Sequence, residues 1–319
     1  MSNIKNVVII GASGNLGPTV LNQFVNSPFN VTVFSRKESN AVFPESVKVI
    51  KTDFSSESLS QNLAGQDAVI CTLGGVEGFR DQARIIDAAI AAGVKRFIPS
   101  EFGSDTTSPE VLNIVPAFGP KVETIDYLKS KESEAFSWTS VIPGLFFDWG
   151  SKFGSIGFDF QNRKAAIWDG GDVAFSATNT STVGLALVRS LSAPNLEATR
   201  NRHVFLASHT VTQNEMVTAL EKLTGQSWEI SNVDSALVIE GKSKEFRDGN
   251  SKAAFPLIQS SIFGKPGFCN FTGKTWNEKL GLPKEDFEAD LKDILEGRKP
   301  EPFGRQVGRY PDWSDPGSK

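Results

Sequence analysis

The stretch that decides the fold is Val7-Val8-Ile9-Ile10-Gly11-Ala12-Ser13-Gly14-Asn15-Leu16-Gly17, near the start of the 319-residue chain. Its four β-branched residues are typical of a strand buried on both faces of a parallel sheet. Gly11 allows a tight turn, Gly14 lets the backbone approach a diphosphate, and Gly17 lets the next helix pack closely on the strand. We therefore expect the N–H groups at the start of that helix to face phosphates.

The residues after the loop decide between a cofactor site and an ordinary strand-to-helix turn, because glycines at this spacing fit both. Pro18 suits the first turn of a helix, and apolar residues between Val20 and Val25 recur at helical spacing. A second strand follows at residues 31–34. Strand, loop, helix and strand thus come in the order that a dinucleotide-binding fold requires.

The end of the second strand carries Arg36, about 20 residues beyond the glycine loop, where such folds contact the adenosine ribose. An acidic residue there pairs with the 2′-hydroxyl of NAD, whereas an arginine accommodates the 2′-phosphate of NADP. No carboxylate follows Arg36 before Glu38, so we predict NADP(H) as the cofactor. The alternative is that Arg36 and Lys37 form a solvated strand end.

Strands and helices alternate along the first half of the chain, which predicts an α/β fold with a doubly wound parallel Rossmann sheet. The expected strands are 7–10, 31–34, 47–50, 68–73, 96–99 and 138–142, and the expected helices are 56–63, 80–92 and 121–135. We assign residues 1–150 to an NADP-binding Rossmann domain and residues 151–319 to a smaller, partly interleaved α/β substrate lobe.

The second half has a less regular pattern. We expect residues 175–225 to return to the Rossmann sheet, with a helix at 182–191 and a strand at 203–207. The remaining expectations are a helix at 213–223, a short strand at 228–230, a mixed region at 235–264, a last helix at 284–296 and an extended tail after Pro300.

Composition narrows the class of protein. The content of 39% hydrophobic and 22% charged residues indicates a globular protein. The net charge of −4 gives no excess of positive charge that would favour binding to nucleic acid. It has no run of about 20 apolar residues to cross a membrane and no leader-like start, so we expect a cytoplasmic location. Cys71 and Cys269 are far apart, and His203 and His209 lack metal-ligand spacing, so we expect no disulfide and no metal site.

Ligands of such a sheet bind at the carboxyl ends of its strands. We expect Asp53 and Phe54 to flank adenine, residues 72–74 to pass the ribose and diphosphate, and Ser100 to meet residues 143–147 near the nicotinamide. The predicted cofactor contacts are Gly11, Ser13, Gly14, Asn15, Leu16, Gly17, Arg36, Lys37, Asp53, Phe54, Thr72, Leu73, Gly74, Ser100, Pro143, Leu145 and Phe146.

The segment Arg96-Phe97-Ile98-Pro99-Ser100-Glu101-Phe102-Gly103 resembles the isoflavone-reductase-like branch of the atypical short-chain dehydrogenases, in the NmrA-like superfamily. That family pairs a GxxGxxG loop with a strand-end arginine, a PSEFG-type loop and a lysine on the next helix. Residues 118–121, 144–150 and 168–172 look similar to its fungal members. The resemblance spans most of the chain.

Two lysines compete for the catalytic role that the resemblance implies. Tyr127 and Lys131 match the YxxxK pair of ordinary short-chain dehydrogenases, but only about two helical turns separate Lys131 from the next strand, which places it far from the strand ends. Lys121 stands near the helix start, with Ala117 where that tyrosine would be. The resemblance thus implies that Lys121 is catalytic and contacts the nicotinamide ribose. A surface lysine is the alternative.

The implied reaction is hydride transfer from NADPH to a small aromatic or conjugated carbonyl compound, with Lys121 stabilising oxyanion charge. A positive helix terminus and a cationic cofactor are expected to lower the pKa of Lys121. The aromatic residues expected to wall the substrate pocket are Phe102, Phe118, Phe146, Trp149 and Phe153, although aromatic runs near strand ends are more often core. The oligomeric state is expected to be monomer or homodimer.

Two other functions remain open at this point. The NmrA-like superfamily includes regulators that bind NADP without turnover and act through a protein partner, and the missing tyrosine keeps that function in play. A non-redox rearrangement in the same pocket is the third possibility.

Overall fold

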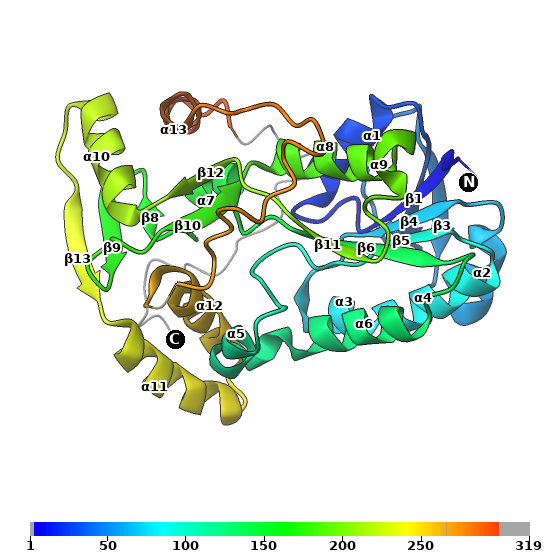
Figure 1. Ribbon diagram of the computed structural model, residues 1–319, viewed down its shortest axis with the longest axis horizontal. Helices are drawn as coiled ribbons and strands as arrows, with labels where there is room; N and C mark the ends of the chain where they lie inside the picture. The colour runs from blue at the N-terminus through cyan, green and yellow to red at the C-terminus, as the bar shows by residue number, and fades with distance from the viewer. Residues whose placement is uncertain (1–2, 266, 300–319) are drawn as a thin grey trace.

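The structure is a computed structural model that describes residues 3–265 and 267–299. Within these residues the largest sheet has seven strands in the order β11-β6-β5-β4-β1-β2-β3, and every neighbouring pair is parallel (Figure 1). The strands are β1 (Asn6–Ile10), β2 (Asn30–Arg36), β3 (Lys48–Thr52), β4 (Ala68–Cys71), β5 (Arg96–Ile98), β6 (Ser137–Ile142) and β11 (Arg202–Phe205). The doubly wound α/β class is therefore confirmed.

Strand β1 occupies the centre of this sheet because its side chains are apolar on both faces. Residues Val7 to Ile10 are 0% exposed. Val7 and Ile9 enter one hydrophobic core, and Val8 and Ile10 enter the core on the opposite face. Each such side chain contributes about 1.5–3 kcal/mol of transfer free energy relative to an exposed one, so these four buried side chains anchor the centre of the sheet.

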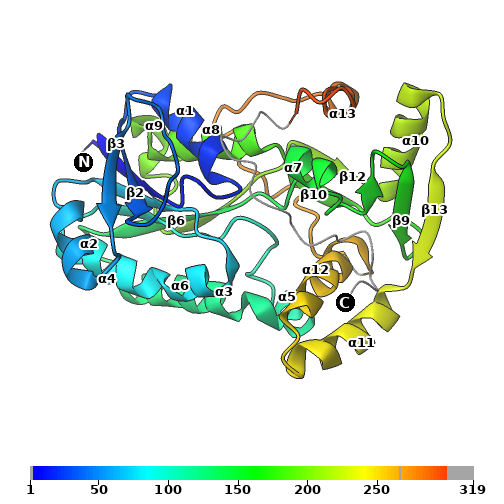
Figure 2. The same ribbon diagram turned by 180° about the vertical axis from the view of Figure 1, so that it is seen from behind.

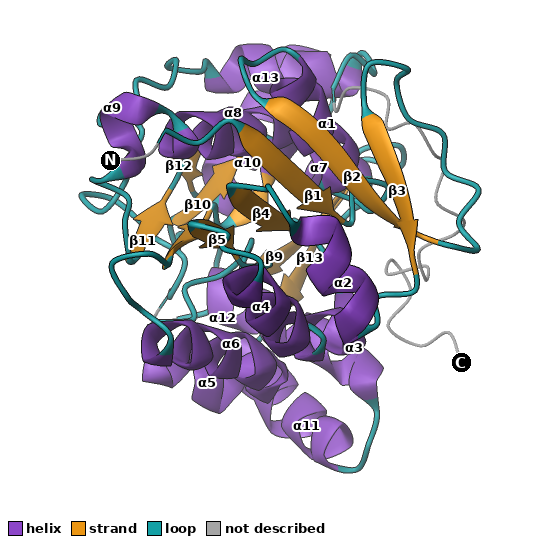
Figure 3. Ribbon diagram, turned by 90° about the vertical axis from the view of Figure 1, so that its right-hand side faces the viewer, coloured by secondary structure: helices purple, strands orange, loops and turns teal. Residues whose placement is uncertain are grey.

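Helices cover the two faces of the sheet in separate layers (Figure 3). One face carries α1 (Gly17–Val25), α8 (Thr180–Leu191) and α9 (Ala193–Leu196). The opposite face carries α2 (Ser56–Leu63), α3 (Gly75–Arg80), α4 (Gln82–Ala91) and α6 (Gly119–Ser130). The helix expected at 80–92 is α4, and the short helix α3 precedes it. The helix expected at 121–135 ends at Ser130, because residues 133–136 close a turn through Ser133 N and the Phe136 carbonyl oxygen.

A second lobe lies beside the sheet along the long axis of the molecule (Figure 2). It holds two three-stranded sheets, β12-β10-β7 and β13-β9-β8. Their strands are β7 (Leu145–Phe146), β8 (Phe158–Asp159), β9 (Lys164–Trp168), β10 (Phe175–Thr178), β12 (His209–Val211) and β13 (Glu229–Val233). The helices of this part are α7 (Phe147–Lys152), α10 (Gln213–Thr224), α11 (Ser235–Arg247), α12 (Ala254–Phe263) and α13 (Phe287–Leu295), with a short 3-10 helix η2 (Ser251–Ala253).

The segment 175–225 divides between the two parts. Helix α8 and strand β11 join the seven-stranded sheet and its core, whereas β10, β12 and α10 belong to the second lobe. The region of mixed pattern at 235–264 consists of the helices α11 and α12. The tail expected after Pro300 lies outside the described residues.

A short bridge of helices joins the lobes on the α6 side. Helix α5 (Pro109–Ile114) and the 3-10 helix η1 (Pro116–Phe118) lead directly into α6. Val111, Val115 and Phe118 pack with Leu257 of α12 in a separate apolar cluster. In the described part of the chain, no helix combines the length and apolar character that a membrane crossing needs.

Candidate functional site

The glycine loop between β1 and α1 is closed to added side chains at two of its three glycines. Gly11 has φ +90°, and a Cβ there would lie 2.8 Å from the carbonyl carbon and oxygen of Thr72. A Cβ on Gly17 would lie 2.2 Å from the Gly11 carbonyl oxygen. Gly14 donates its N–H to the same oxygen at 2.9 Å, but a Cβ there would stand 3.2 Å away. Gly11 and Gly17 therefore serve the fold, and Gly14 is the glycine at which an added Cβ would meet the mildest contact.

Helix α1 begins at this loop without a side-chain cap. The N-cap residue, Leu16, is itself buried in the core and makes no capping hydrogen bond. No acidic residue stands in the first turn. The first N–H groups of α1 and the positive end of its dipole thus suit a phosphate, and only the backbone of Leu16 can take part.

The ends of β2 and β3 bring the predicted ribose contacts together. Arg36 is exposed at the last position of β2 and pairs in register with Thr52 of β3. Lys37 Nζ lies 2.8 Å from Asp53 Oδ2, and Asp53 Oδ1 accepts the Ser55 N–H at 3.0 Å. The structure thus holds Asp53 against Lys37. Phe54, expected at the adenine, follows with φ +59° and is half-buried.

The ends of β4 and β5 are tied to β1 and to each other. Thr72 Oγ1 donates to the Ile10 carbonyl oxygen at 3.0 Å, and Ser100 Oγ donates to the Leu73 carbonyl oxygen. Ser100 N–H donates to Gln82 Oε1 at 2.7 Å. Gly74 is exposed beyond them. The hydroxyl groups of Thr72 and Ser100 thus donate to backbone carbonyl oxygens beside the carboxyl ends of β1 and β4, and the contacts predicted for them with the cofactor stay predictions.

Lys121 lies inside the protein, so it is not a surface lysine. It is only 5% exposed, on the first turn of α6. Its Nζ donates to the Glu101 carbonyl oxygen at 2.6 Å and lies 5.4 Å from the centre of the Phe118 ring. Burial lowers the pKa of Lys121, and the negative charge of Glu101 opposes that effect. A lowered pKa was expected, but its main cause is burial.

Glu101 is a second buried titratable group, and the sequence predicted no role for it. Its side chain is 1% exposed, and its two carboxylate oxygens accept no hydrogen bond within the described ranges. Burial raises the pKa of Glu101, and Lys121 counteracts that rise. The signal in the sequence was an acid directly after the buried strand β5, within the segment that carries the family resemblance. The two titratable side chains are thus buried near each other after β5, and Lys121 is held by the backbone of Glu101 rather than by its carboxylate.

The competing pair, Tyr127 and Lys131, contacts Asp87 of α4. Tyr127 Oη donates to Asp87 Oδ1 of α4 at 2.6 Å, and Lys131 Nζ lies 3.6 Å from the same carboxylate atom. Lys131 is the C-cap residue of α6, directly after Ser130. Both side chains are thus engaged with Asp87 between two helices, away from Lys121 and Glu101.

The five aromatic residues predicted at the substrate pocket lie in two groups, and their role in substrate binding stays a prediction. Phe146, Trp149 and Phe153 form a chain of rings along β7 and α7, with centroids 6.5 Å and 4.9 Å apart. Phe102 and Phe146 pack against the core of the Rossmann sheet, whereas Phe118 is buried among α5, η1 and α12 beside Lys121. Leu145 is half-buried next to Phe146, and Pro143 accepts Thr178 Oγ1 at 2.6 Å.

The two cysteines and His209 lie in the interior and have structural roles. Cys71 and Cys269 are buried free thiols. His209 is buried, with Nε2 2.7 Å from Asp290 Oδ2 of α13. Within residues 3–265 and 267–299, no three His, Cys, Asp or Glu side chains are grouped so that they could hold a metal ion.

Comparisons with known proteins identify the family. The model of the NmrA-like family matches residues 3–240. An oxidoreductase of Aspergillus flavus, aprR, is 32% identical over 91% of this chain and 99% of its own length. A phenylcoumaran benzylic ether reductase of Ginkgo biloba, IRL1, is 27% identical over 83% of this chain and 89% of its own length.

Solved structures agree in fold. The structure of AtPrR2 with NADP+ and (+)pinoresinol superposes with a TM-score of 0.73 at 20% identity, covering 92% of this chain and all of that one. A ternary complex of leucoanthocyanidin reductase from Vitis vinifera gives a TM-score of 0.73 at 17% identity, covering 91% and 99%. The chain belongs to the NmrA-like family, and the predicted resemblance is confirmed.

Proposed function

We propose that this member of the NmrA-like family is an NADPH-dependent reductase that delivers hydride to a small aromatic or conjugated carbonyl compound. Its curated relatives include oxidoreductases and a phenylcoumaran benzylic ether reductase. Similar folds carry NADP+ with pinoresinol and NADPH. The observation that carries the proposal is the buried Lys121, because burying an ammonium without a function is costly.

The residues of the loop fit a dinucleotide diphosphate. Gly14 leaves space at the loop, α1 starts without a cap or an acidic residue, and Arg36 stands exposed at the end of β2. These are the features that a diphosphate and a 2′-phosphate need. We assign Arg36 and Lys37 to the 2′-phosphate side of NADP(H), with Asp53 fixing the position of Lys37.

Bound NADPH would supply the hydride, and the residues of this chain would manage charge. The Lys121 ammonium, held by the Glu101 carbonyl oxygen, is positioned to stabilise negative charge that develops on a substrate oxygen or to give that oxygen a proton. A lowered pKa favours proton release near neutral pH. Phe146, Trp149 and Phe118 offer apolar ring surface for an aromatic substrate.

The test is to titrate the purified protein with NADPH and NADH, and then to follow NADPH oxidation with a panel of aromatic enones and benzylic ethers. We expect tighter binding of NADPH and oxidation with part of the panel. Tight NADPH binding without oxidation of any member would favour the regulator, whose specific support is Ala117 in place of a tyrosine. An isomerised product without net NADPH oxidation would favour a rearrangement.

A further inference from the structure

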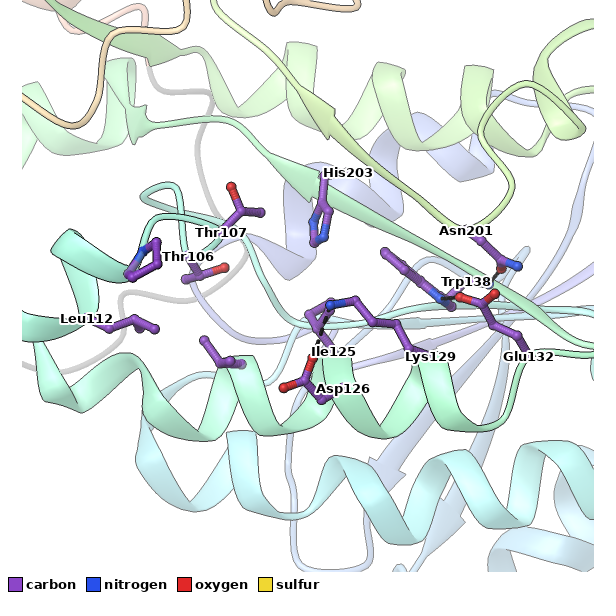
Figure 4. A pocket seen from close by; sticks show the side chains of 12 residues that line it. Thr106, Thr107, Leu112, Ile125, Asp126, Lys129, Glu132, Trp138, Asn201 and His203 are labelled. Carbon is purple, nitrogen blue, oxygen red and sulfur yellow. Dashed lines mark hydrogen bonds and ion pairs between the residues drawn. The ribbon is translucent and has the colours of Figure 1, made fainter.

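A pocket of about 710 Å³ lies between α6 and the strands β6 and β11 (Figure 4). Its lining comes from α5, α6, the two strands and the loops beside them, and it includes neither Lys121 nor any residue of the glycine loop. The lining residues are Thr106, Thr107, Pro109, Leu112, Val122, Ile125, Asp126, Lys129, Glu132, Trp138, Asn201 and His203. Its size falls within the range of about 300–1,000 Å³ that small-molecule sites occupy.

Two walls of the pocket suit a flat, apolar molecule. On the sheet side, the rings of Trp138 and His203 meet edge to face, with centroids 5.1 Å apart. On the helix side, Ile125 presents an aliphatic group, and Leu112 lies at the end near α5 (Figure 4). Val122 of α6 also lines the pocket. An aromatic ring between these walls would bury its faces against carbon atoms on both sides.

His203 adds one polar contact to the apolar walls. Its Nδ1 is buried and has no hydrogen-bond partner among residues 3–265 and 267–299. Burial, followed by the charge of Lys129, lowers the pKa of His203, so the imidazole is neutral near pH 7. A buried ring nitrogen without a partner is costly, and a ligand hydroxyl or carbonyl would relieve that cost.

The rim selects against anions. Lys129 Nζ is paired with Asp126 Oδ1 at 3.0 Å, and both side chains are largely exposed. Glu132 accepts the Trp138 Nε1 hydrogen bond at 2.7 Å and adds a second carboxylate. Because the carboxylates outnumber the ammonium, a phosphate or carboxylate ligand would meet net repulsion.

We propose that this pocket is a second binding site, separate from the Lys121 crevice, for a neutral aromatic molecule that bears a hydroxyl group. Two of its lining residues are close in sequence to Glu101 and Lys121: Thr106 follows Glu101 by five residues, and Val122 directly follows Lys121. The lining includes neither Lys121 nor Glu101, and Val122 and Ile125 line the pocket from α6 while Lys121 Nζ is directed at the Glu101 carbonyl oxygen. Thr106 stands at the boundary, since its side chain also acts on Glu101. The assignment does not depend on the reductase activity.

The test uses 2-naphthol as the probe and protein labelled with 5-fluorotryptophan, with NADPH present. The fluorine signal of Trp138 is assigned by its loss in Trp138→Phe. We expect this signal to shift and saturate with 2-naphthol, and His203→Phe to weaken the binding about tenfold through loss of one hydrogen bond. Naphthalene should bind as weakly to the wild type as 2-naphthol does to His203→Phe, and 2-naphthoate should bind least.

A pocket-filling variant locates the binding. Val122→Phe places a ring in the pocket and should abolish the shift of Trp138, whereas Val122→Ala should retain it. Leu112→Phe serves the same purpose if Val122→Phe fails to fold, which thermal unfolding will show. Any of three results would overturn the proposal. The Trp138 signal does not shift with 2-naphthol, the two filling variants respond as the wild type does, or 2-naphthoate binds as tightly as 2-naphthol.

Discussion

The two sides of the proposed crevice are built in opposite ways. The glycine loop offers backbone and positive dipole, and at Gly17 even one added carbon would lie 2.2 Å from the Gly11 carbonyl oxygen. The Lys121 side offers two buried charged side chains, Lys121 at 5% and Glu101 at 1% exposure. The loop side should therefore be sensitive to added volume, and the lysine side to a changed charge at constant volume.

The largest effect is expected from added volume at Gly14. Gly14→Val should abolish measurable NADPH binding, because the branched side chain fills the space left for the diphosphate. The fold should survive with some loss of stability, because a Cβ at Gly14 would stand 3.2 Å from the Gly11 carbonyl oxygen, a close contact that a shift of a few tenths of an ångström relieves. Calorimetric titration and thermal unfolding measure the two properties. Gly14→Ala is the matched control and should bind with intermediate affinity; full affinity in a folded Gly14→Val would show that the loop is only a turn.

The next largest effect is expected from removing charge at Lys121. Lys121→Met keeps most of the side-chain length, so NADPH affinity should fall only modestly. Turnover should fall by about 10²–10⁴, the usual contribution of a positioned proton donor. Steady-state oxidation of NADPH measures it. Tyr127→Phe and Lys131→Met are the controls and should be nearly silent, because both side chains contact Asp87. Collapse of activity in Tyr127→Phe would assign the catalysis to the other pair.

A smaller effect is expected at Arg36, which lies on the loop side but acts by charge. Arg36→Asp should weaken NADPH binding by about 2–3 kcal/mol, because charge-assisted hydrogen bonds to the 2′-phosphate are replaced by repulsion. NADH binding should change much less. Parallel titrations with both cofactors measure the difference. Equal losses for NADPH and NADH would remove Arg36 from the ribose site.

The smallest effect is expected at Glu101, and it concerns pH. The charge of Glu101 raises the pKa of Lys121 against the effect of burial, so Glu101→Gln should lower that pKa further. The ammonium would then be lost at lower pH, and the basic limb of the turnover profile should move to lower pH. Glu101→Asp retains the charge and should move the limb less. A basic limb that stays in place would show that Glu101 is only structural.

Local signals made the Rossmann half predictable. The four apolar residues before Gly11 and the glycines themselves act over a few residues, so their sequence is sufficient to identify strand, turn and helix. Lys121 could be placed at the crevice because its distance along α6 from the next strand is a matter of helix geometry. The burial of Glu101 could not be predicted, because it depends on α6 and on the loop at 102–106 folding over it.

The second lobe depends on contacts between distant residues. Strand β9 pairs with β13, where Ala165 meets Ile230, and β10 pairs with β12. Helix α11 fully buries only Ser235 and packs through the partly buried Val238, Ile239 and Phe246, so its apolar face is narrow. Helix α12 is apolar over most of its surface. Neither helix shows the period that identifies a helix from sequence. The packing of Phe118 with Leu257 of α12 could not be predicted for the same reason.

The order of the strands also constrains how the protein is made. Strand β11 closes the sheet beside β6, and α8 covers α1. In the chain, however, both come after the strands β7, β8, β9 and β10 of the second lobe. A growing chain leaves the ribosome from its N-terminus, so the apolar face of α1 emerges long before the helix that shields it. The cofactor half of the molecule therefore cannot complete its own folding during synthesis until α8 and β11 have been translated.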